Sequence, residues 1–450
     1  MSNGMLPSYL SMAKPNPLEN RTPWYKSTAP TYAGIFLWVV FYMKIAEGTL
    51  PKAGLGLCIL GLVVAALICH FLFYLVPGLL GMKTGYPLYV VGSSTYGTQG
   101  GFLMPGLLMG LLQFGWLGVN IAVSTSFIIQ AAGSEAGPGS APFIIICIVW
   151  GLAAALMGVM GIQYVAKVAT FLPIVPFVMI LIVFFMNVGS AGDYKVPEGS
   201  SEPLVGFLTI IAIVVGFFAT AGAAGVDFGM GNRNEKDVKL GGLVGIALAI
   251  IFTGALPLIA IAGAHGADPK PESFTFDAVI SSQGGILASS MFILFAIASF
   301  APACFSSFIA ANSIGTMFPK TNKLAMVLIG AVISIVLAAS GKALNLIGVF
   351  SIIGASFGPI CGSMAADYLL SGCKWAGPRK GINLAGYIAW AVGFVVAILP
   401  TINSEKFGFI NPAPVIAFVI GFVLYVVLAK AGLEPPTVEM AATAPAAGEK

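Results

Sequence analysis

Charged residues are scarce in this chain of 450 residues, where they make up 8% of the sequence against 58% hydrophobic residues. A soluble globular protein carries roughly a quarter charged residues. This chain therefore has too few charges to cover a surface that faces water. The net charge of +4 is small and spread along the chain, which argues against nucleic-acid binding, because that needs a clustered basic face.

The residue sets that most enzymes use are also missing. The sequence contains no HExxH motif, no P-loop, no metal-ligand cluster and no nucleophile–base set, which argues against an embedded enzyme and against an ATP-driven pump. The two histidines, His70 and His265, lie far apart and are interpreted as packing or interfacial residues. The cysteines form no CxxC pair and are interpreted as small packing residues, with Cys373 at a helix end and the others in apolar runs: Cys58, Cys69, Cys147, Cys304 and Cys361.

Long apolar runs, in contrast, account for most of the chain. About 20 apolar residues are needed to cross the hydrocarbon core of a bilayer as a helix, and no soluble domain is inserted between the runs. The sequence therefore predicts an all-α polytopic membrane protein with about twelve transmembrane helices. The predicted spans cover residues 31–50, 53–79, 100–131, 141–161, 165–188, 204–229, 241–265, 284–316, 323–340, 343–370, 383–400 and 411–431.

Lysine and arginine are distributed unevenly between the two sides of these spans. If the N-terminus is cytoplasmic, fifteen of them lie on the inside and five on the outside, and such residues accumulate in cytoplasmic loops. Both termini are therefore predicted to be cytoplasmic, in an inner or plasma membrane, with residues 1–30 as a polar leading segment. Residues 432–450 are rich in Ala, Pro and Glu and are predicted to form a disordered tail.

The sixth span carries an unusual run of glycine between residues 216 and 231. Such a run weakens a helix, and non-helical backbone at membrane depth is tolerated where it lines a cavity, as in transporter binding sites. The run predicts a broken helix, and the alternative is close helix packing by small residues. Close packing is the preferred interpretation for Gly354, Gly358 and Gly362 in the tenth span.

The first span is the other candidate for an interruption, because Lys44 and Glu47 lie in its outer half. A buried charge in a span is costly and is usually functional or paired. These two residues are spaced for an i, i+3 ion pair. The alternative is that both lie near the outer interface and extend toward water.

Three residues of the third span point to a planar ligand. Gln113, Trp116 and Asn120 are spaced i, i+3, i+7 and therefore share one helical face. Amides in hydrocarbon need partners, and an indole ring beside them offers a flat stacking surface. The alternative is that the amides join helices and the tryptophan is a core residue.

Other polar and aromatic candidates lie in the sixth and eighth spans. Phe217, Phe218 and Thr220 lie at the predicted break, where an aromatic ring would form the opposite wall of a stacking slot. In the eighth span, the adjacent hydroxyls of Ser306 and Ser307 are suited to an oxygen cage for a monovalent cation, although serine in a span often bonds its own backbone. Asp227 is interpreted as a cytoplasmic-end residue paired with a nearby base, with a proton site as the alternative.

At these residues the sequence resembles the nucleobase:cation symporter-1 family, which includes cytosine permeases and a hydantoin transporter. Five short motifs carry the resemblance in the family's order. They are GMKTG at 81–85, QFGWLGV at 113–119, GFFAT at 216–220 followed by DF at 227–228, SSFIAAN at 306–312, and ADYLL at 366–370.

The resemblance implies the leucine-transporter fold. It places a first inverted repeat of five helices at 31–188, a second at 204–370, and two additional helices at 383–431. It also implies alternating access around a midplane site, where Trp116 stacks on one face of the substrate and Phe218 on the other. The polar edges would be bound by Asn120, Gln113 and Asn312, with further contacts from Phe217 and Thr220.

The resemblance further implies a sodium site. Its ligands would be the Ser306 and Ser307 hydroxyls and the Ala303 carbonyl, completed by first-helix carbonyls near Trp38–Tyr42. Lys44 is not part of the family pattern, and if it reached this site its charge could replace sodium.

The implied function is a monomeric secondary transporter, not an enzyme, that imports a nucleobase or related planar nitrogen heterocycle with Na⁺ or H⁺ and needs no cofactor. Phe218, Asn120 and Phe308 stand where some family members have Trp, Gln and Asn, so the substrate is expected to differ from cytosine. The alternatives are an amino-acid or amine transporter of the same fold, for which Lys44 would supply a charge, and a channel.

Overall fold

A computed structural model describes residues 6–160, 163, 167, 171–268, 270–318 and 320–440 of the chain. Within these residues, ten helical segments are long and apolar enough to cross a membrane. They are α4–α5 (Leu50–Thr84), α7 with its preceding turns (Phe102–Ala131), α8 (Ala141–Met160), α10 (Ile174–Asn187) with the turn that extends it to Asp193, α11 (Pro203–Ala223), α13–α14 (Glu235–Gly266), α16 (Gly285–Met317), α18 (Leu346–Leu370), α19 (Leu384–Ile402) and α21 (Ala413–Leu428) with the turn that extends it to Leu433.

The predicted spans agree with these bounds to within a few residues for most helices. The predicted ninth span appears as α17 (Lys323–Ala339), which is apolar but shorter than the others. The first appears as two pieces, α2 (Thr28–Leu37) and α3 (Val39–Tyr42). Most of the predicted start of the fifth span, 165–170, falls outside the described residues.

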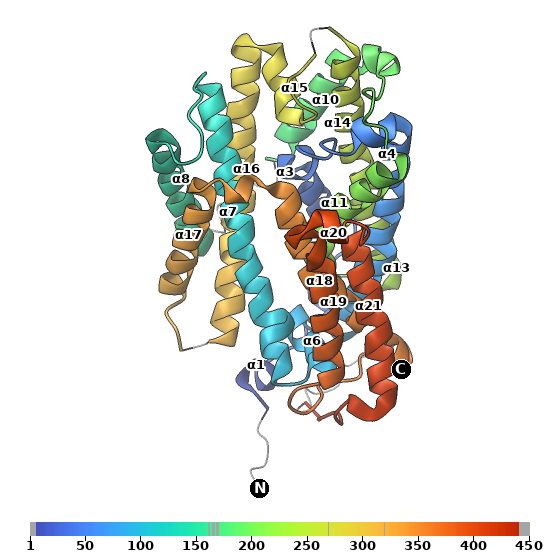
Figure 1. Ribbon diagram of the computed structural model, residues 1–450. Helices are drawn as coiled ribbons and strands as arrows, with labels where there is room; N and C mark the ends of the chain where they lie inside the picture. The colour runs from blue at the N-terminus through green and yellow to red at the C-terminus, as the bar shows by residue number, and fades with distance from the viewer. Residues whose placement is uncertain are drawn as a thin grey trace.

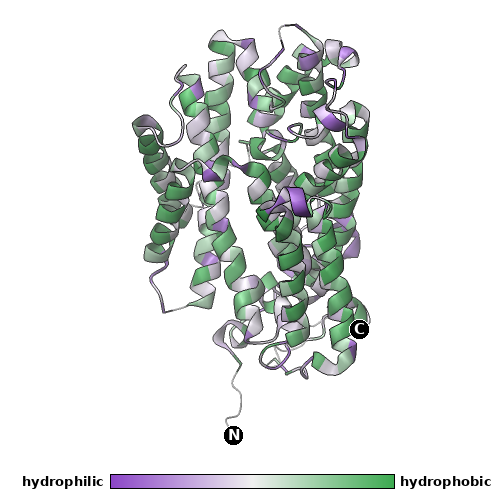
Figure 2. Cartoon of the chain, in the orientation of Figure 1, coloured by the Kyte–Doolittle hydropathy of each residue, from purple (hydrophilic) through white to green (hydrophobic). Residues whose placement is uncertain are grey.

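The outer surface of the helices is apolar, as Figure 2 shows along the length of the bundle. Large hydrophobic side chains are exposed on widely separated helices, among them Phe71, Val149, Ile333 and Val427. Monomeric soluble proteins rarely expose apolar surface on this scale. The surface therefore fits a multi-pass membrane protein.

Two helices run through the middle of the bundle and position the site. The most apolar stretch of α7 is 72% buried, as is that of α18, whereas that of α10 is 17% buried. Helices α8 and α17 lie on one flank, and α19 and α21 lie on the other (Figure 1). Side chains that project from the inner faces of α7 and α18 are therefore shielded from lipid.

The first helix, the other candidate for an interruption, is interrupted at Trp38, before the Lys44 and Glu47 that motivated the prediction. Trp38 has extended backbone angles (φ −67°, ψ 126°), which end α2 and start α3. A helix end leaves N–H and C=O groups without their intrahelical partners, and at membrane depth these groups must be satisfied by protein or by a polar cavity. The interruption thus places backbone polar groups inside the bundle.

The break predicted in the sixth helix lies later than expected. Helix α11 continues without interruption through Phe217, Phe218 and Thr220, and the irregular residue is Ala224, before the short α12 (Gly225–Gly229). The interruption still falls inside the glycine run, and glycines on either side of it also serve close packing. A Cβ at Gly216 would lie 2.6 Å from the Phe350 carbonyl oxygen, and one at Gly229 would lie 2.1 Å from that of Gly78.

Close packing also explains the glycines of the tenth span, as predicted. A Cβ at Gly362 in α18 would lie 2.1 Å from the Phe418 carbonyl oxygen of α21, and one at Gly358 would lie 2.8 Å from that of Pro414. Small residues at such a crossing let two helix backbones approach each other. These glycines therefore fix α21 against α18.

The described parts of both termini meet at one end of the bundle, around α1 (Ser8–Ser11) and α6 (Leu88–Tyr96) (Figure 1). The Tyr9 hydroxyl donates to the Thr98 carbonyl at 2.6 Å. At the other terminus, the prediction of a disordered tail is wrong for the residues around Glu434, whose carboxylate lies 3.0 Å from the Arg379 guanidinium. The Val438 N–H also donates to the Pro378 carbonyl at 2.7 Å. Residues 441–450 lie outside the described residues.

A buried ion cluster holds this end together. The Arg379 guanidinium donates to Asp367 at 2.8 Å, and the second carboxylate oxygen of Asp367 accepts from the Ser94 hydroxyl at 2.6 Å and the Thr95 hydroxyl at 3.1 Å. Asp367 and Arg379 are both buried. Because a buried charge is tolerated only when it is paired and hydrogen-bonded, this cluster fixes α6, α18 and the C-terminal segment relative to one another.

The opposite end of the bundle is covered by α15 (Phe276–Gln283) (Figure 1). The Phe276 N–H donates to the Met43 carbonyl at 2.9 Å, and the Phe276 ring packs edge-to-face on Tyr42 with 5.1 Å between ring centroids. Both side chains are fully buried. The segment that follows α3 is therefore closed off by α15 at this end.

The predicted Lys44–Glu47 pair forms beside this closure, with 2.9 Å between the ammonium and the carboxylate. Both side chains are partly exposed. Nearby in α15, burial raises the pKa of Asp277, while the Thr275 hydroxyl, the backbone and the Lys44 ammonium act in the opposite direction. Lys44 is thus held among carboxylates at the α15 end.

Candidate functional site

Trp116 is the centre of the candidate site. It lies in the middle of α7, on the face that it shares with Gln113 and Asn120, and all three side chains are buried. The opposite face of α7 packs on α17, where the Ser334 hydroxyl donates to the Phe114 carbonyl at 2.7 Å. This contact orients α7 so that the face predicted from the spacing, with Trp116 on it, points into the bundle.

Three aromatic rings surround Trp116. Phe217 of α11 lies 5.4 Å away edge-to-face, Trp38 at the first-helix interruption lies 5.6 Å away at 62°, and Phe350 of α18 lies 5.9 Å away at 39°. Phe217 and Phe350 also contact each other at 5.3 Å. We call these four residues the aromatic cluster. It joins four helical pieces at the point where the first helix is interrupted.

The expected pairing of Trp116 with Phe218 is not present. Phe218 is fully buried and stacks on Phe36 of α2, with 5.7 Å between centroids and 25° between planes. The adjacent Phe217 contacts Trp116 instead. Neighbouring residues on a helix point about 100° apart, and the close approach of α11 to α18 at Gly216 determines which one faces the cluster.

The polar partners around the indole ring follow the prediction in part. The Trp116 indole N–H donates to the Thr220 hydroxyl at 3.4 Å, and the Asn120 side chain donates to the Trp116 carbonyl at 3.1 Å. The Asn120 carbonyl oxygen is buried and has no partner among the described residues. The Gln113 amide makes only a weak contact with the Met109 sulfur at 3.7 Å. Polar groups with unused capacity therefore lie beside Trp116.

Asn312 does not join this cluster. Its side chain is exposed, and the neighbouring Ser313 packs against Gly110 of α7. Gly110 precedes Trp116 by about 9 Å along the helix axis, given a rise of about 1.5 Å per residue. The structure thus places Asn312 toward the α1–α6 end, away from the indole ring.

Two residues of the aromatic cluster were missed in the sequence. Trp38 was considered only for its backbone carbonyl, although a tryptophan in an irregular span was a usable signal. Phe350 gave no signal, because phenylalanine is common in membrane cores and its position depends on how α18 crosses α11.

Relatives among curated proteins are permeases. Cytosine permease of Escherichia coli (strain K12) is 27% identical over 299 residues, a match that covers 65% of this chain and 66%, about two thirds, of the permease. The putative allantoin permease of the same strain is 23% identical over 427 residues, covering 82% of this chain and 84% of that protein. No family model matches the chain.

Solved structures show the same fold. Mhp1, described as a nucleobase-cation-symport-1 family transporter, was solved in a closed conformation with bromovinylhydantoin bound, and it matches with a TM-score of 0.68 at 17% identity over 95% of this chain and 96% of that one. Its inward-facing conformation matches with a TM-score of 0.70 at 17% identity, over 98% and 97% of the two chains. These relatives and solved structures bear out the resemblance to the nucleobase:cation symporter-1 family.

The three residues expected to bind sodium are buried in α16. The Ser307 hydroxyl donates to the Ala303 carbonyl at 3.3 Å, and Ser307 packs against Gly158 of α8. Ser306 is also buried. Within the described ranges, no hydrogen bond links α16 to the segment 38–42, and the Trp38 carbonyl accepts from the Phe41 N–H at 2.9 Å.

Among the residues that the structure describes, no basic side chain pairs with Asp227, contrary to the expectation. Its carboxylate accepts from the Leu88 N–H at 3.0 Å, which is the first N–H of α6. The basic residues of the nearby turn use other carboxylates: Arg233 pairs with Asp237 at 2.8 Å and Lys239 pairs with Glu235 at 3.3 Å. An anion is stabilised at a helix N-terminus, so Asp227 caps α6.

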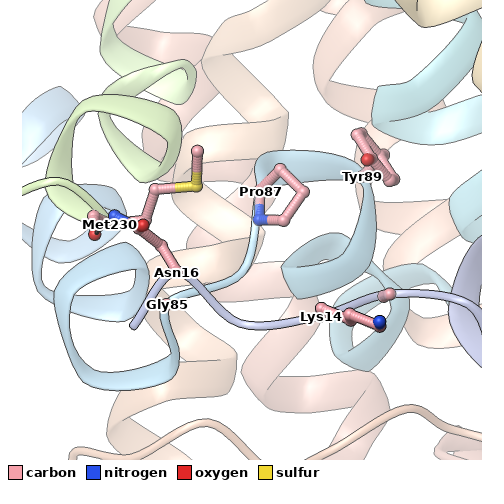
Figure 3. Close-up of a pocket in the computed structure, with 7 residues that line it drawn as sticks. Lys14, Asn16, Gly85, Pro87, Tyr89 and Met230 are labelled. Carbon is pink, nitrogen blue, oxygen red and sulfur yellow. Dashed lines mark hydrogen bonds between the residues drawn. The ribbon is translucent and has the colours of Figure 1, made fainter. Parts of the chain in front are cut away.

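An open pocket of about 450 Å³ lies at the α1–α6 end (Figure 3). It is lined by Ala13, Lys14, Asn16, Gly85, Pro87, Tyr89 and Met230. None of the predicted site residues lines this pocket. It is therefore a feature of the bundle end and separate from the aromatic cluster.

Proposed function

We propose that this chain is a secondary active transporter that carries a planar nitrogen heterocycle of the nucleobase or hydantoin class across the membrane together with a cation. The observation that carries the proposal is the aromatic cluster: a buried indole ring, surrounded by Phe217, Trp38 and Phe350, lies where the first helix is interrupted. Aromatic faces stack on flat rings irrespective of ring identity, and the amides beside them can bind polar ring edges.

The permeases among the relatives support this assignment. Cytosine and allantoin, named in those proteins, are small nitrogen heterocycles, and Mhp1 binds a hydantoin derivative. All three ring types offer carbonyl acceptors and N–H donors beside a flat or nearly flat face. A stacking wall with adjacent amides is suited to each of them.

The two ends of the bundle support alternating access. The α15 end is closed by Phe276 and Tyr42, both fully buried, whereas Asn312 is exposed toward the other end. With both termini in the cytoplasm, this state is closed to the outside. The cation can shift the protein toward the outward-open state only if it binds that state more tightly than this one.

For the coupling ion we propose sodium, held by the Ala303 carbonyl and the hydroxyls of Ser306 and Ser307. Oxygen ligands suit a hard cation, and binding there would tie α16 to the interrupted first helix. Coupling to protons is the alternative.

The amino-acid alternative is weakened by the pairing of Lys44. A carboxylate substrate would need a free positive charge near the interrupted helices. The Lys44 ammonium lies 2.9 Å from Glu47, so its charge is already neutralised in this state.

Uptake into liposomes tests the proposal. We expect purified protein in liposomes to accumulate radiolabelled cytosine, uracil, allantoin or hydantoin when an inward sodium gradient is imposed, because the gradient drives the coupled step. Ser307→Ala should remove the sodium dependence, since it deletes one cation ligand. A thermal-shift screen of the same compounds identifies the best of them beforehand, because a ligand that binds the folded state stabilises it.

The outcomes separate the parts of this proposal. Strong uptake that does not depend on sodium but is abolished by a protonophore would show that the coupling ion is the proton and not sodium. Saturable uptake of amino acids, with none for any heterocycle, would overturn the substrate class. Flux without saturation or counterflow would indicate a channel.

A further inference from the structure

Trp38 is a part of the aromatic cluster whose side chain has no assigned role. It lies at the interruption between α2 and α3. Its ring contacts Trp116 at 5.6 Å and Phe217 at 6.2 Å between centroids. The first helix thus contributes a side chain to the wall that Trp116 and Phe217 form, in addition to its backbone.

The indole N–H of Trp38 is buried and has no hydrogen-bond partner in the described part of the chain. Three other indoles have acceptors: Trp116 donates to Thr220, Trp375 to the Val91 carbonyl at 3.0 Å, and Trp390 to the Ser356 carbonyl at 2.9 Å. Only the Trp150 N–H in α8, outside the aromatic cluster, shares the unpartnered state of Trp38 among the described residues. A buried indole N–H usually finds an acceptor. A buried donor without one is destabilising and calls for an explanation.

The same cluster also contains an unused acceptor. The Asn120 side chain donates to the Trp116 carbonyl at 3.1 Å, while its own carbonyl oxygen is buried and has no partner within the described residues. One donor and one acceptor, each attached to a residue in contact with Trp116, are therefore left open. A ligand that stacks on Trp116 and fills both must carry an acceptor and an N–H on its ring edge.

We propose that Trp38 is a specificity-determining residue that donates its indole N–H to a carbonyl oxygen or ring nitrogen of the substrate, while Asn120 accepts from a ring N–H. This inference rests on the proposed function, because it concerns the same stacking site. It narrows the substrate to cyclic amides and amidines and disfavours flat rings that lack an acceptor. The indole selects by hydrogen bonding, and the rings of Trp116 and Phe217 supply the stacking.

The test compares Trp38→Phe with the unchanged protein by isothermal titration calorimetry, with cytosine and hydantoin as probes. Phenylalanine keeps a ring in place but removes the donor, so the better probe should bind about 10-fold more weakly, as expected for one lost hydrogen bond in a buried site. Trp150→Phe is the matched control. This substitution also removes a buried indole N–H that has no partner among the described residues. Trp150, however, packs on Phe300 of α16, outside the aromatic cluster, so ligand binding should not change.

A second probe pair distinguishes a lost hydrogen bond from disturbed packing. In dithiohydantoin both carbonyl oxygens are replaced by sulfur, a weaker acceptor. Trp38→Phe should therefore weaken hydantoin binding more than dithiohydantoin binding. If Trp38→Phe weakens the binding of both probes equally, or binds hydantoin within twofold of the unchanged protein, the role of Trp38 is overturned while the proposed function stands. If the unchanged protein binds no probe, the proposed function fails, and this inference fails with it.

Discussion

Replacing Trp116 with alanine is expected to weaken heterocycle binding by on the order of 100-fold, because stacking on one aromatic face contributes about 1–3 kcal/mol. The side chain is buried and contacts three other rings. Its removal deletes the stacking surface and loosens the rings that remain. Calorimetry with the best compound from the thermal-shift screen measures the loss.

Two further variants control this experiment. Trp116→Phe keeps a flat face but loses the hydrogen bond to Thr220, so it should retain part of the affinity. Trp150→Ala in α8 changes a tryptophan outside the aromatic cluster and should bind like the unchanged protein. If Trp116→Ala binds a heterocycle with unchanged affinity, the aromatic cluster is only a packing core.

Replacing Asp367 with alanine is expected to be the most destabilising single change at the α1–α6 end, at a cost on the order of 3 kcal/mol. Among the described residues, the substitution leaves the buried Arg379 with Glu434 as its one carboxylate partner, and it removes the carboxylate that accepts from Ser94 and Thr95. The effect is measured as a lower midpoint of thermal unfolding of the purified protein in detergent.

An exposed ion pair provides the comparison. Glu235 pairs with Lys83 and Lys239, and all three side chains are a third or more exposed. Glu235→Ala should cost at most about 1 kcal/mol, because exposed pairs are screened by water. Equal effects of the two substitutions would show that the buried cluster does not hold this end together.

The sequence predicted the features that depend on local pattern. Apolar runs of sufficient length gave the helices, and the i, i+3, i+7 spacing placed Gln113, Trp116 and Asn120 on one buried face. The Lys44–Glu47 pair also follows from spacing within a few residues. In each case the determining contacts lie within one or two helical turns.

The features that were wrong depend on contacts between distant helices. Whether Phe217 or Phe218 faces Trp116 is decided by the rotation of α11, which the contact of Gly216 with Phe350 fixes. A glycine run is compatible with both a broken helix and a close crossing, and the position of Gly78 on the neighbouring helix decides between them at Gly229. Composition alone suggested a disordered tail. It could not show that Glu434 pairs with Arg379, because that residue lies on a loop far away in the sequence.

The position of a bound ligand tests the central claim most directly. A structure of the protein with a brominated hydantoin, located by the anomalous signal of bromine, should place the heterocycle within about 4 Å of the Trp116 indole, the contact distance of stacked rings. A ligand found only in the open pocket between Lys14 and Tyr89, or anywhere that does not touch Trp116, would contradict the account.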